Sequence, residues 1–485
     1  MARVALLAAG LFAFVAGAGC FGEGDPLATD PSTALGPLEV ADAYSVLESG
    51  EAEKLPAVFD DLVEREDRRF IAPLIEVLRA SQLGLLTGSH HNALIVTLER
   101  LSGQPLGADW FKWVTWYRGT SLEGPPGFAE FKARLLYRIE PTLGDFVEAS
   151  PAAEMRTEEL LWTGSGVDQP GALQHPPRVP AGESLLAPEE AVVGLFGADA
   201  PLAVPLRYLD WHEFLNDRHA GVDYVLVSCV LCGSVTAFEA PVHDGKPSLF
   251  AASGLLMRSV RLMYDDGTRT LWNELTGRAA FGPRAETGER LRSLPVVVTT
   301  WGAWLEQHPE SSAVELPGGE ERYKPGNPWG EYMISPEPAF PVGLDRAEFA
   351  PKVRVVGLEI GLRTKAWALE PLMSKRVLHD ELDGRPIVLI AARGPVNVMG
   401  LNQRVGELEY TVGAEVRAFF SEGPRFRAGS AQDTLETADG DVWRIGEDAL
   451  HGPGGEQFAR LRLTPAFWFA WQAFHPSTEV WPPAE

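Results

Sequence analysis

The stretch 192–229, "VVGLFGADAPLAVPLRYLDWHEFLNDRHAGVDYVLVSC", has a counterpart at 355–392, "VVGLEIGLRTKAWALEPLMSKRVLHDELDGRPIVLIAA". Both begin with Val-Val-Gly-Leu and continue through an amphipathic segment of helical spacing. An aspartate, a glycine and a hydrophobic run typical of a strand then follow in each. This shared order predicts that one domain is present twice in the chain.

The downstream segments correspond as well. "TTWGAWLEQHPESSAV" parallels "AFWFAWQAFHPSTEVW", which sets Trp304 opposite Trp471 and His308 opposite His475. Positions that both copies share are most simply structural. Positions that only one copy has need another explanation.

The expected copies have α+β texture with mostly antiparallel strands. Short β-branched or aromatic runs bounded by turns, such as "VDYVLVS" and "LPVVVTT", predict strands. "PLRYLDWHEFLND" and "TWGAWLEQHPE" predict helices between them. We expect the first copy at residues 178–316 and the second at 346–485, with a Pro/Gly-rich linker at 317–345.

Upstream of the copies, the chain is predicted to be all-helical from residue 38 to residue 150. The segment "LSGQPLGADWFKWVTWY" carries Trp110, Trp113 and Trp116, and their spacing is typical of a helical core. Successive short helices predict a stack of helical pairs, and this ending resembles the close of HEAT-like repeats in exported bacterial proteins. A breaker-rich stretch at 151–177 is expected to be a linker.

The first twenty residues, "MARVALLAAGLFAFVAGAGC", have the layout of an export signal. One cation, Arg3, precedes an apolar run that is too short to anchor the chain in a bilayer. Small residues lead directly into Cys20, which resembles a bacterial lipoprotein signal with a lipid-modified cysteine; ordinary secretion is the alternative. Residues 21–37 are expected to be a flexible tether. The sequence therefore predicts a lipid-anchored protein on the periplasmic or outer-surface side of a bacterial envelope.

Composition excludes some classes of function. The chain has 485 residues, and its hydrophobic content of 45% is sufficient for packed cores. Its formal net charge of -25 opposes nucleic-acid binding, which depends on Lys and Arg, so no nucleic-acid partner is expected. No phosphate-binding loop of the Walker type, G-x-S-x-G elbow or H-E-x-x-H motif stands in the chain.

Two cysteines at C-x-x-C spacing lie in the first copy. In an exported protein, Cys229 and Cys232 are a disulfide, metal ligands or a redox couple. The second copy has Ala392 and Pro395 at these positions. It also replaces three polar residues of the preceding stretch, namely His212, Glu213 and Asn216, by Lys375, Arg376 and His379. Loss of the whole group predicts a site in the first copy; drift between two structural copies is the alternative.

The residue types suit metal or thiol chemistry. An imidazole beside a thiol activates it, and one imidazole with two thiolates forms a ligand set for Zn or Cu. In this hypothesis Cys229 is the thiolate or ligand and Cys232 the second ligand or resolving thiol. His212 is then the base or ligand, and Glu213 and Asn216 orient it.

Three segments carry a family resemblance. "AVPLRYLDWHEFLNDRHAGVDYVLVSCVLCGSVTAFEA", "ASGLLMRSVRLMYDDGTRTLWNELTGRAAFGP" and "LPVVVTTWGAWLEQHP" resemble the bacterial exported family called domain of unknown function 3179. Its pattern runs "AYPL-IL-WHEI-ND", "TYCPLCG-A-AFDR", "F-VSG-L-NS-LVMYD--T-SLW-Q-TG-A--G" and "T-W--W---HP". The resemblance covers about 178–316, with Val230 where the family commonly has Pro, and it supplies no established reaction. It implies three further pocket-lining residues, Ser253, Trp272 and Glu274, and Ser234 of the turn after the cysteines is also expected to line the pocket.

These observations favour an extracytoplasmic lipoprotein with a Cys/His site that binds a metal or depends on a thiol. The sequence leaves open whether the protein is an enzyme. The alternative is a non-catalytic envelope scaffold or interaction module, in which the helical repeats bind a protein partner.

Overall fold

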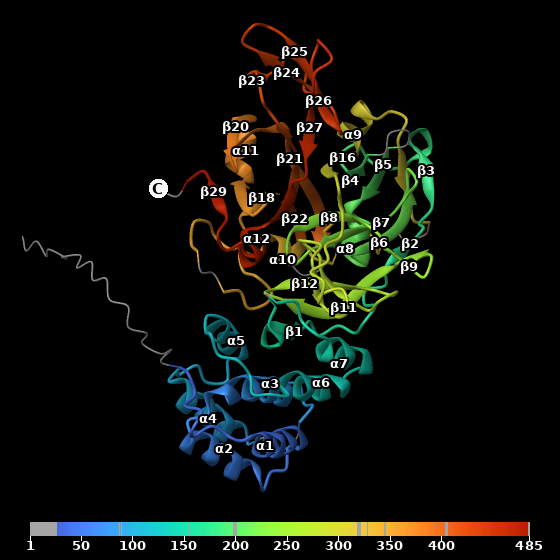
Figure 1. Cartoon of the computed structure of the whole chain (residues 1–485). Helices are drawn as coiled ribbons and strands as arrows, with labels where there is room; N and C mark the ends of the chain where they lie inside the picture. The colour runs from blue at the N-terminus through green and yellow to red at the C-terminus, as the bar shows by residue number, and fades with distance from the viewer. Residues whose placement is uncertain are drawn as a thin grey trace, which may run out of the picture.

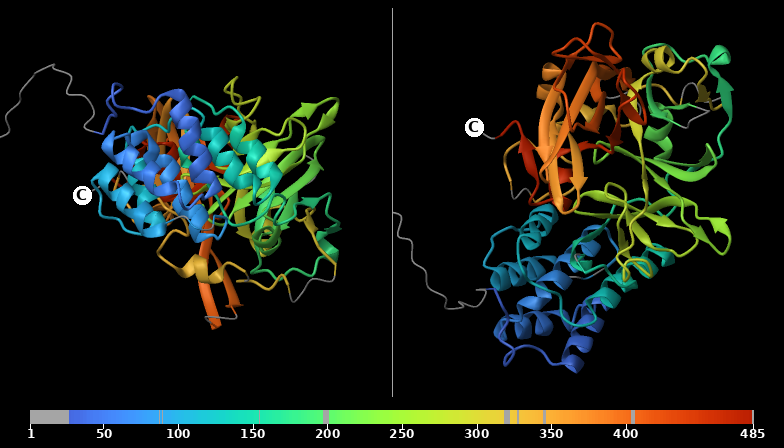
Figure 2. Two further views of the ribbon diagram at one scale, coloured as in Figure 1. Left: turned by 90° about the horizontal axis from the view of Figure 1, so that it is seen from below. Right: turned by 45° about the horizontal axis from the view of Figure 1, so that its top comes forward.

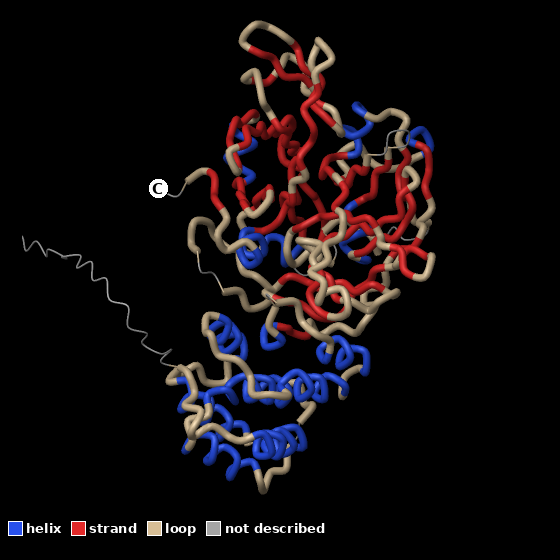
Figure 3. The backbone as a smooth tube through the Cα atoms, in the orientation of Figure 1, coloured by secondary structure: helices blue, strands red, loops and turns tan. Residues whose placement is uncertain are grey.

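The computed structural model describes residues 27–86, 88, 90–153, 155–196, 201–317, 322–326, 328–343, 346–402 and 406–483. An all-helical region comes first and covers one end of a β-rich region (Figures 1 and 3). The expected signal peptide with Cys20 lies outside the described residues, as do residues 21–26 of the expected tether. Within the described ranges, no helix is long and apolar enough to cross a membrane.

The helical region packs its helices through apolar faces. Leu47, Leu62 and Leu98 are each at most 1% exposed in one continuous core. Trp113 is fully buried and donates its indole N–H to the Gly107 carbonyl at 2.7 Å. The all-helical prediction for this region is therefore confirmed. Its α-helices are α1 (Pro37–Ser49), α2 (Leu55–Glu64), α3 (Ile71–Gln82), α4 (His91–Ser102), α5 (Trp110–Arg118), α6 (Phe128–Tyr137) and α7 (Pro141–Glu148), with a 3-10 turn at Arg68–Phe70.

The segment 151–177, expected to be a linker, contributes strands to the β-rich region. Strand β1 (Leu160–Trp162) pairs antiparallel with β11, and β2 (Leu173–Gln174) pairs parallel with β6. Leu160 and Leu161 are buried in the hydrophobic core, so strand pairing and apolar burial hold this segment against the β-rich region.

The first unit, residues 178–314, is built mainly from antiparallel strands. Its sheets have the orders β16-β4-β5-β17-β3, β15-β8-β7-β6-β2 and β1-β11-β12-β13-β14, with a small β9–β10 pair. Two short helices, α8 (Leu206–His212) and α9 (Trp301–Gln307), accompany them. The strands are β3 (Arg178–Pro180), β4 (Ala191–Leu195), β5 (Leu202–Pro205), β6 (Phe214–His219), β7 (Val222–Cys229), β8 (Ser234–Glu239), β9 (Val242–His243), β10 (Lys246–Pro247), β11 (Phe250–Met257), β12 (Val260–Asp265), β13 (Leu271–Asn273), β14 (Ala279–Phe281), β15 (Ser293–Leu294), β16 (Val296–Thr300) and β17 (Ser312–Val314).

The second unit, residues 354–481, follows a connecting segment that contains α10 (Gly330–Ile334). Its sheets have the orders β28-β18-β19-β29 and β20-β21-β22-β27-β26-β25-β24-β23. Figure 2 shows the two units side by side on the helical region. The elements are β18 (Arg354–Ile360), β19 (Arg363–Ala368), α11 (Leu369–Lys375), β20 (Val377–Leu382), β21 (Arg385–Asn402), β22 (Gly406–Phe420), β23 (Phe426–Ala428), β24 (Thr434–Thr437), β25 (Val442–Ile445), β26 (Ala449–His451), β27 (Gln457–Leu461), β28 (Thr464–Phe467), α12 (Trp468–Phe474) and β29 (Glu479–Trp481).

One sheet in each unit has the same strand order and directions. The order β16-β4-β5-β17 matches β28-β18-β19-β29, and the last pair is parallel in both. A tryptophan covers a glycine at the same place. A Cβ atom on Gly194 would lie 2.2 Å from the Trp304 ring, and one on Gly357 would lie 2.3 Å from the Trp471 ring. Only glycine fits at either position without a shift of the indole.

The first helix of the first unit is shorter than the sequence predicts. Helix α8 ends at His212 because Glu213 adopts a positive φ of 58°, and β6 begins at Phe214. The expectation that Asn216 lies on this helix is therefore wrong. Arg376 has a φ of 62° directly after α11, so the backbone turns in the same way in the second unit.

The next connection differs between the units. Strands β7 and β8 are joined by a tight turn that holds both cysteines, whereas β21 and β22 form a hairpin of 18-residue and 15-residue strands. Val398 and Tyr410 of this hairpin pack into the same core as Tyr208 and Leu209 of the first unit. The second unit therefore reaches across to the first through its longest hairpin.

Candidate functional site

The C-x-x-C turn contains a disulfide. The Cys229 and Cys232 sulfurs are 2.01 Å apart, and neither residue has any exposed surface. Cys229 pairs with Ser234 where β7 and β8 end and begin, and Gly233 between them has a φ of 63°. Of the three interpretations of this cysteine pair, the disulfide is the one that the structure contains.

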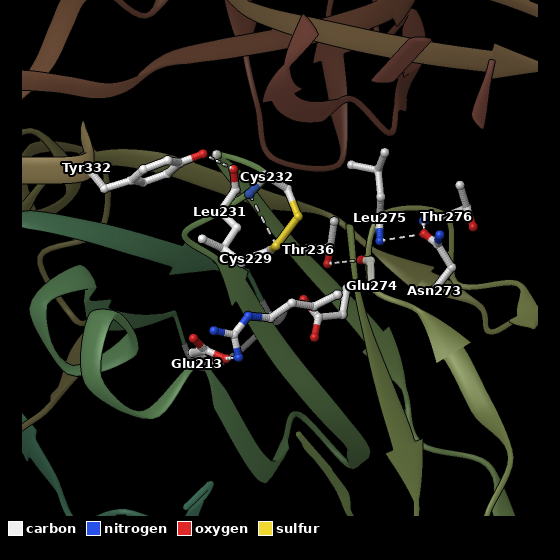
Figure 4. The surroundings of a disulfide bond; sticks show 12 residues. Glu213, Cys229, Leu231, Cys232, Thr236, Asn273, Glu274, Leu275, Thr276 and Tyr332 are labelled. Carbon is white, nitrogen blue, oxygen red and sulfur yellow. Dashed lines mark hydrogen bonds and ion pairs between the residues drawn. A yellow bond between two sulfur atoms is a disulfide. The ribbon is translucent and has the colours of Figure 1, made fainter. Parts of the chain in front are cut away.

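The second unit and the connecting segment cover the turn. The Phe467 N–H donates to the Cys232 carbonyl at 2.7 Å, and the Tyr332 hydroxyl donates to the Leu231 carbonyl at 2.7 Å (Figure 4). A Cβ atom on Gly233 would lie 2.8 Å from the Phe467 ring. The turn is therefore a packed junction and not an open active-site loop.

His212 belongs to a different local network. One ring nitrogen lies 2.8 Å from the Gly171 carbonyl and the other lies 2.7 Å from the Tyr323 hydroxyl. Burial lowers the pKa of His212, which favours the neutral imidazole. Among the described residues, no group of three or more His, Cys, Asp and Glu side chains is placed to hold a metal ion. The expected ligand set of His212, Cys229 and Cys232 is therefore not formed, because both imidazole nitrogens have other partners.

Two of the expected site residues, Glu213 and Glu274, lie in the surroundings of the disulfide (Figure 4). Arg261, 7% exposed, donates to the Glu213 carboxylate at 2.6 Å. Burial and the Glu213 charge raise the pKa of Glu274 to about 8, although Arg261 opposes this. Glu274 therefore carries a proton at neutral pH, and the family pattern has the neutral residue Gln at this position.

This cluster of Glu213, Arg261 and Glu274 has unused hydrogen-bonding capacity. Arg261 Nε and Glu274 Oε1 are buried and have no hydrogen-bond partner within the described part of the chain. Fully buried polar groups without partners are costly, so the cluster is a place where stability depends on protonation.

The remaining expected residues make bonds that hold the strands together. Asn216 exchanges two hydrogen bonds with the Phe250 backbone, at 2.9 and 2.8 Å, and so ties β6 to β11. Ser253 donates to the Leu262 carbonyl at 2.6 Å, and the Trp272 indole donates to the Asp265 carboxylate at 2.8 Å. These bonds tie the strands of the first unit together, and Ser234 is buried at the start of β8.

Sequence reasoning missed Asp210, which lines a cavity of about 660 Å³ between α8 and the β21–β22 hairpin. Asp210 is 6% exposed, and burial together with the Glu190 and Glu213 charges raises its pKa to about 7. A carboxyl group with such a pKa can exchange protons at neutral pH. The signal was available, because the two quoted stretches set Asp210 opposite Met373.

The arrangement defines a class of protein: two β units joined at a buried disulfide turn, preceded by a helical region. The chain belongs to the family described as "Protein of unknown function (DUF3179)", whose profile matches residues 170–478. The match spans both units, so the family domain extends well beyond the 178–316 segment that carries the sequence resemblance. Neither a curated protein nor a solved structure gives a match.

Proposed function

We propose that this chain is a lipid-anchored, extracytoplasmic scaffold or binding protein in which the Cys229–Cys232 disulfide has a structural role. The observation that carries this proposal is the complete burial of both cysteines between the two units. Thiol exchange needs a sulfur atom that a reaction partner can reach, and sulfurs joined in a disulfide are not thiolates that could bind a metal. Disulfides persist in oxidising compartments, which agrees with the export signal expected at residues 1–20.

In this proposal the disulfide shapes a docking platform. The bond fixes a turn whose Cys232 carbonyl accepts the N–H of Phe467, and Phe467 is the last residue of β28. Arg354 of β18 donates to the Gly233 carbonyl at 3.4 Å. A rigid turn keeps both acceptors aimed at the second unit, so the disulfide would stabilise the junction of the units.

The proposal also holds that the two units are diverged tandem copies. It is supported by the shared strand order, by the matching Gly–Trp contacts and by the positive φ of both Glu213 and Arg376. The Ser228 N–H donates to the Glu213 carbonyl and the Ala391 N–H donates to the Arg376 carbonyl, both at 2.8 Å. The first copy would then have kept the tight cysteine turn that the second replaced by a hairpin.

We also propose that the helical region is an interaction surface for a protein partner. Stacked helical pairs of the HEAT-like kind present an extended face that single domains lack. The successive helices α1 to α7 support this assignment. Lipid attachment at Cys20 would hold this region close to the membrane.

The test is thiol titration and metal analysis of the purified full-length protein, alongside Cys229→Ala/Cys232→Ala and His212→Ala variants. We expect no free thiol from this pair before or after unfolding without reductant, and no stoichiometric metal in any of the three proteins. The double variant should fold with a free energy of unfolding lowered by about 2 kcal/mol, the loop-entropy value for so short a loop.

One equivalent of bound metal that disappears in the cysteine variant would overturn the structural role, as would reactive thiols in the native protein. Cys20→Ser tests the anchor in the same preparation. It should move the protein from the membrane fraction to the soluble fraction, and retention on membranes after normal cleavage would contradict lipid anchoring.

A further inference from the structure

A second cavity, of about 320 Å³, lies between the two units where β8 packs against β28. Its wall carries three arginines, Arg290, Arg292 and Arg462, and one carboxylate, Glu359. The other polar side chains of the wall are small hydroxyl groups and one imidazole: Thr236, Thr276, Ser293, Thr464 and His475. The cavity is therefore rich in hydrogen-bond donors.

The positive charges around this cavity are only partly neutralised. Arg278 and Arg290 share one oxygen of Glu359, at 3.1 and 2.6 Å, and Arg292 pairs with Glu239. Arg462 forms no hydrogen bond or ion pair with the described residues, and burial and the neighbouring Arg292 lower its pKa. Four guanidinium groups thus face two carboxylates, in a chain whose net charge is -25.

His475 adds a neutral donor to the same wall. Burial, opposed by Glu359 and assisted by Arg290 and Arg278, lowers the pKa of His475 to about 4. The imidazole is therefore uncharged at neutral pH, and its ring nitrogens have no hydrogen-bond partner within the described ranges. It packs on Trp471 with the ring centroids 4.0 Å apart, which fixes its orientation.

A second interface between the units, where β16 packs against β22, also contains arginines, and there they are paired with carboxylates. There Arg417 and Arg460 are buried and both bind the carboxylate of Glu447, and Arg417 also binds Glu415 at 2.6 Å. Burial alone would raise the pKa of Glu447, but Arg417 and Arg460 outweigh it and hold the pKa well below its usual value. At this interface the arginines are saturated by carboxylates of the chain itself.

We propose that the cavity between β8 and β28 binds a small oxyanion, held by Arg290, Arg292 and Arg462. Guanidinium groups bind carboxylate, phosphate and sulfate oxygens through paired, charge-assisted hydrogen bonds. The oxyanion would take the place that Glu447 occupies at the interface between β16 and β22. The inference is independent of the role of the disulfide and goes beyond the scaffold function.

The test is isothermal titration of the full-length protein with inorganic phosphate, sulfate or succinate, at constant ionic strength set with chloride. At least one of these anions should bind with one-to-one stoichiometry. Arg462→Gln should weaken that binding at least tenfold, and it should leave folding intact because Arg462 has no partner among the described residues. Arg427→Gln, which removes an exposed charge on β23, is the matched control and should leave binding unchanged.

Glu359→Gln supplies a variant with the opposite expected sign. It frees Arg278 and Arg290 for the ligand, so binding should tighten severalfold. The inference is overturned if no anion binds above the chloride background, if Arg462→Gln and Arg427→Gln weaken binding equally, or if Glu359→Gln weakens it. The relative affinities of phosphate, sulfate and succinate then identify the class of oxyanion.

Discussion

The two interfaces between the units differ in how their arginines are paired. Between β16 and β22, the guanidinium groups of Arg417 and Arg460 are paired with the carboxylates of Glu415 and Glu447. Between β8 and β28, the arginines are half-exposed around a cavity. The ion pairs between β16 and β22 stabilise the protein, because both arginines already have carboxylate partners within the chain. The interface between β8 and β28 has fewer stabilising ion pairs, and its guanidinium groups can instead bind the proposed oxyanion.

The largest expected difference comes from removing one carboxylate at each interface. Glu447→Gln should lower the free energy of unfolding by about 3–5 kcal/mol, because it leaves Arg460 without its charge partner and Arg417 with Glu415 alone, and both side chains are largely buried. Glu359→Gln should cost less than about 1 kcal/mol, because Arg278 and Arg290 are 44% and 38% exposed and water can solvate them. Chemical denaturation of both variants provides the measurement. Equal losses would show that the two interfaces do not differ in the way proposed here.

A smaller effect tests whether the two units are built alike. Gly194→Ala and Gly357→Ala should each destabilise the protein by about 1–3 kcal/mol, because a Cβ atom would overlap the Trp304 or Trp471 ring. Gly394→Ala is the matched control, since no atom lies within 4 Å of its Cβ position and, like Gly194 and Gly357, it does not have a positive φ. Thermal denaturation would reveal the losses. A marked loss from only one of the two glycines would weaken the argument for equivalent copies.

The smallest effect concerns the buried cluster beneath the disulfide, which only the first unit has. The folded protein keeps a proton on Glu274 up to about pH 8, whereas an unfolded glutamate releases it near 4.5. Between these values the folded state binds more protons, so the stability of the wild type falls as pH rises through this window. Glu274→Gln removes this dependence and should be more stable than the wild type at pH 9, by a difference in the free energy of unfolding that grows as the pH rises through this window.

The measurement is the free energy of unfolding from pH 5 to pH 9 for the wild type and Glu274→Gln. The curves should separate as pH rises, with the variant above the wild type. Parallel curves would mean that Glu274 does not titrate in the folded state. Glu436→Gln on β24 is the matched control for removing an acidic group at a surface pair.

The sequence patterns predicted a helical region followed by a β-rich region with antiparallel strands, and the structure has both. Val-Val-Gly-Leu, the aspartate, the glycine and the Trp-x-x-x-His ending mark positions where the backbone or packing leaves few choices, such as the Gly–Trp contacts. The strand predictions for "VDYVLVS" and "LPVVVTT" are confirmed as β7 and β16. The sequence predicts too long a first helix, because the helical spacing of "YLDWHEFLND" continues past Glu213. The positive φ of Glu213 ends the helix, and nothing in the segment indicates that φ.

The site was anticipated only in part. Glu213 and Glu274 do lie near the cysteines, but His212 bonds to Gly171 and Tyr323, which stand far from it in the chain. Sequence spacing cannot show that the 151–177 segment, expected to be a linker, places the Gly171 carbonyl within hydrogen-bonding distance of the His212 imidazole. Neither could it show that Phe467 covers the turn.

The sequence alone determined the order of a helical region and a β-rich region, the family, and the positions where local backbone geometry or burial allows few residues. These properties follow from local propensity and from patterns that repeat along one strand or helix. Only the tertiary structure decided which side chains meet. It buried the cysteine pair under the second unit, surrounded the arginines of one interface with carboxylates and left the other interface as an arginine-lined cavity. Each of these depends on segments that are distant in the chain, such as Cys232 and Phe467 or Thr299 and Glu415.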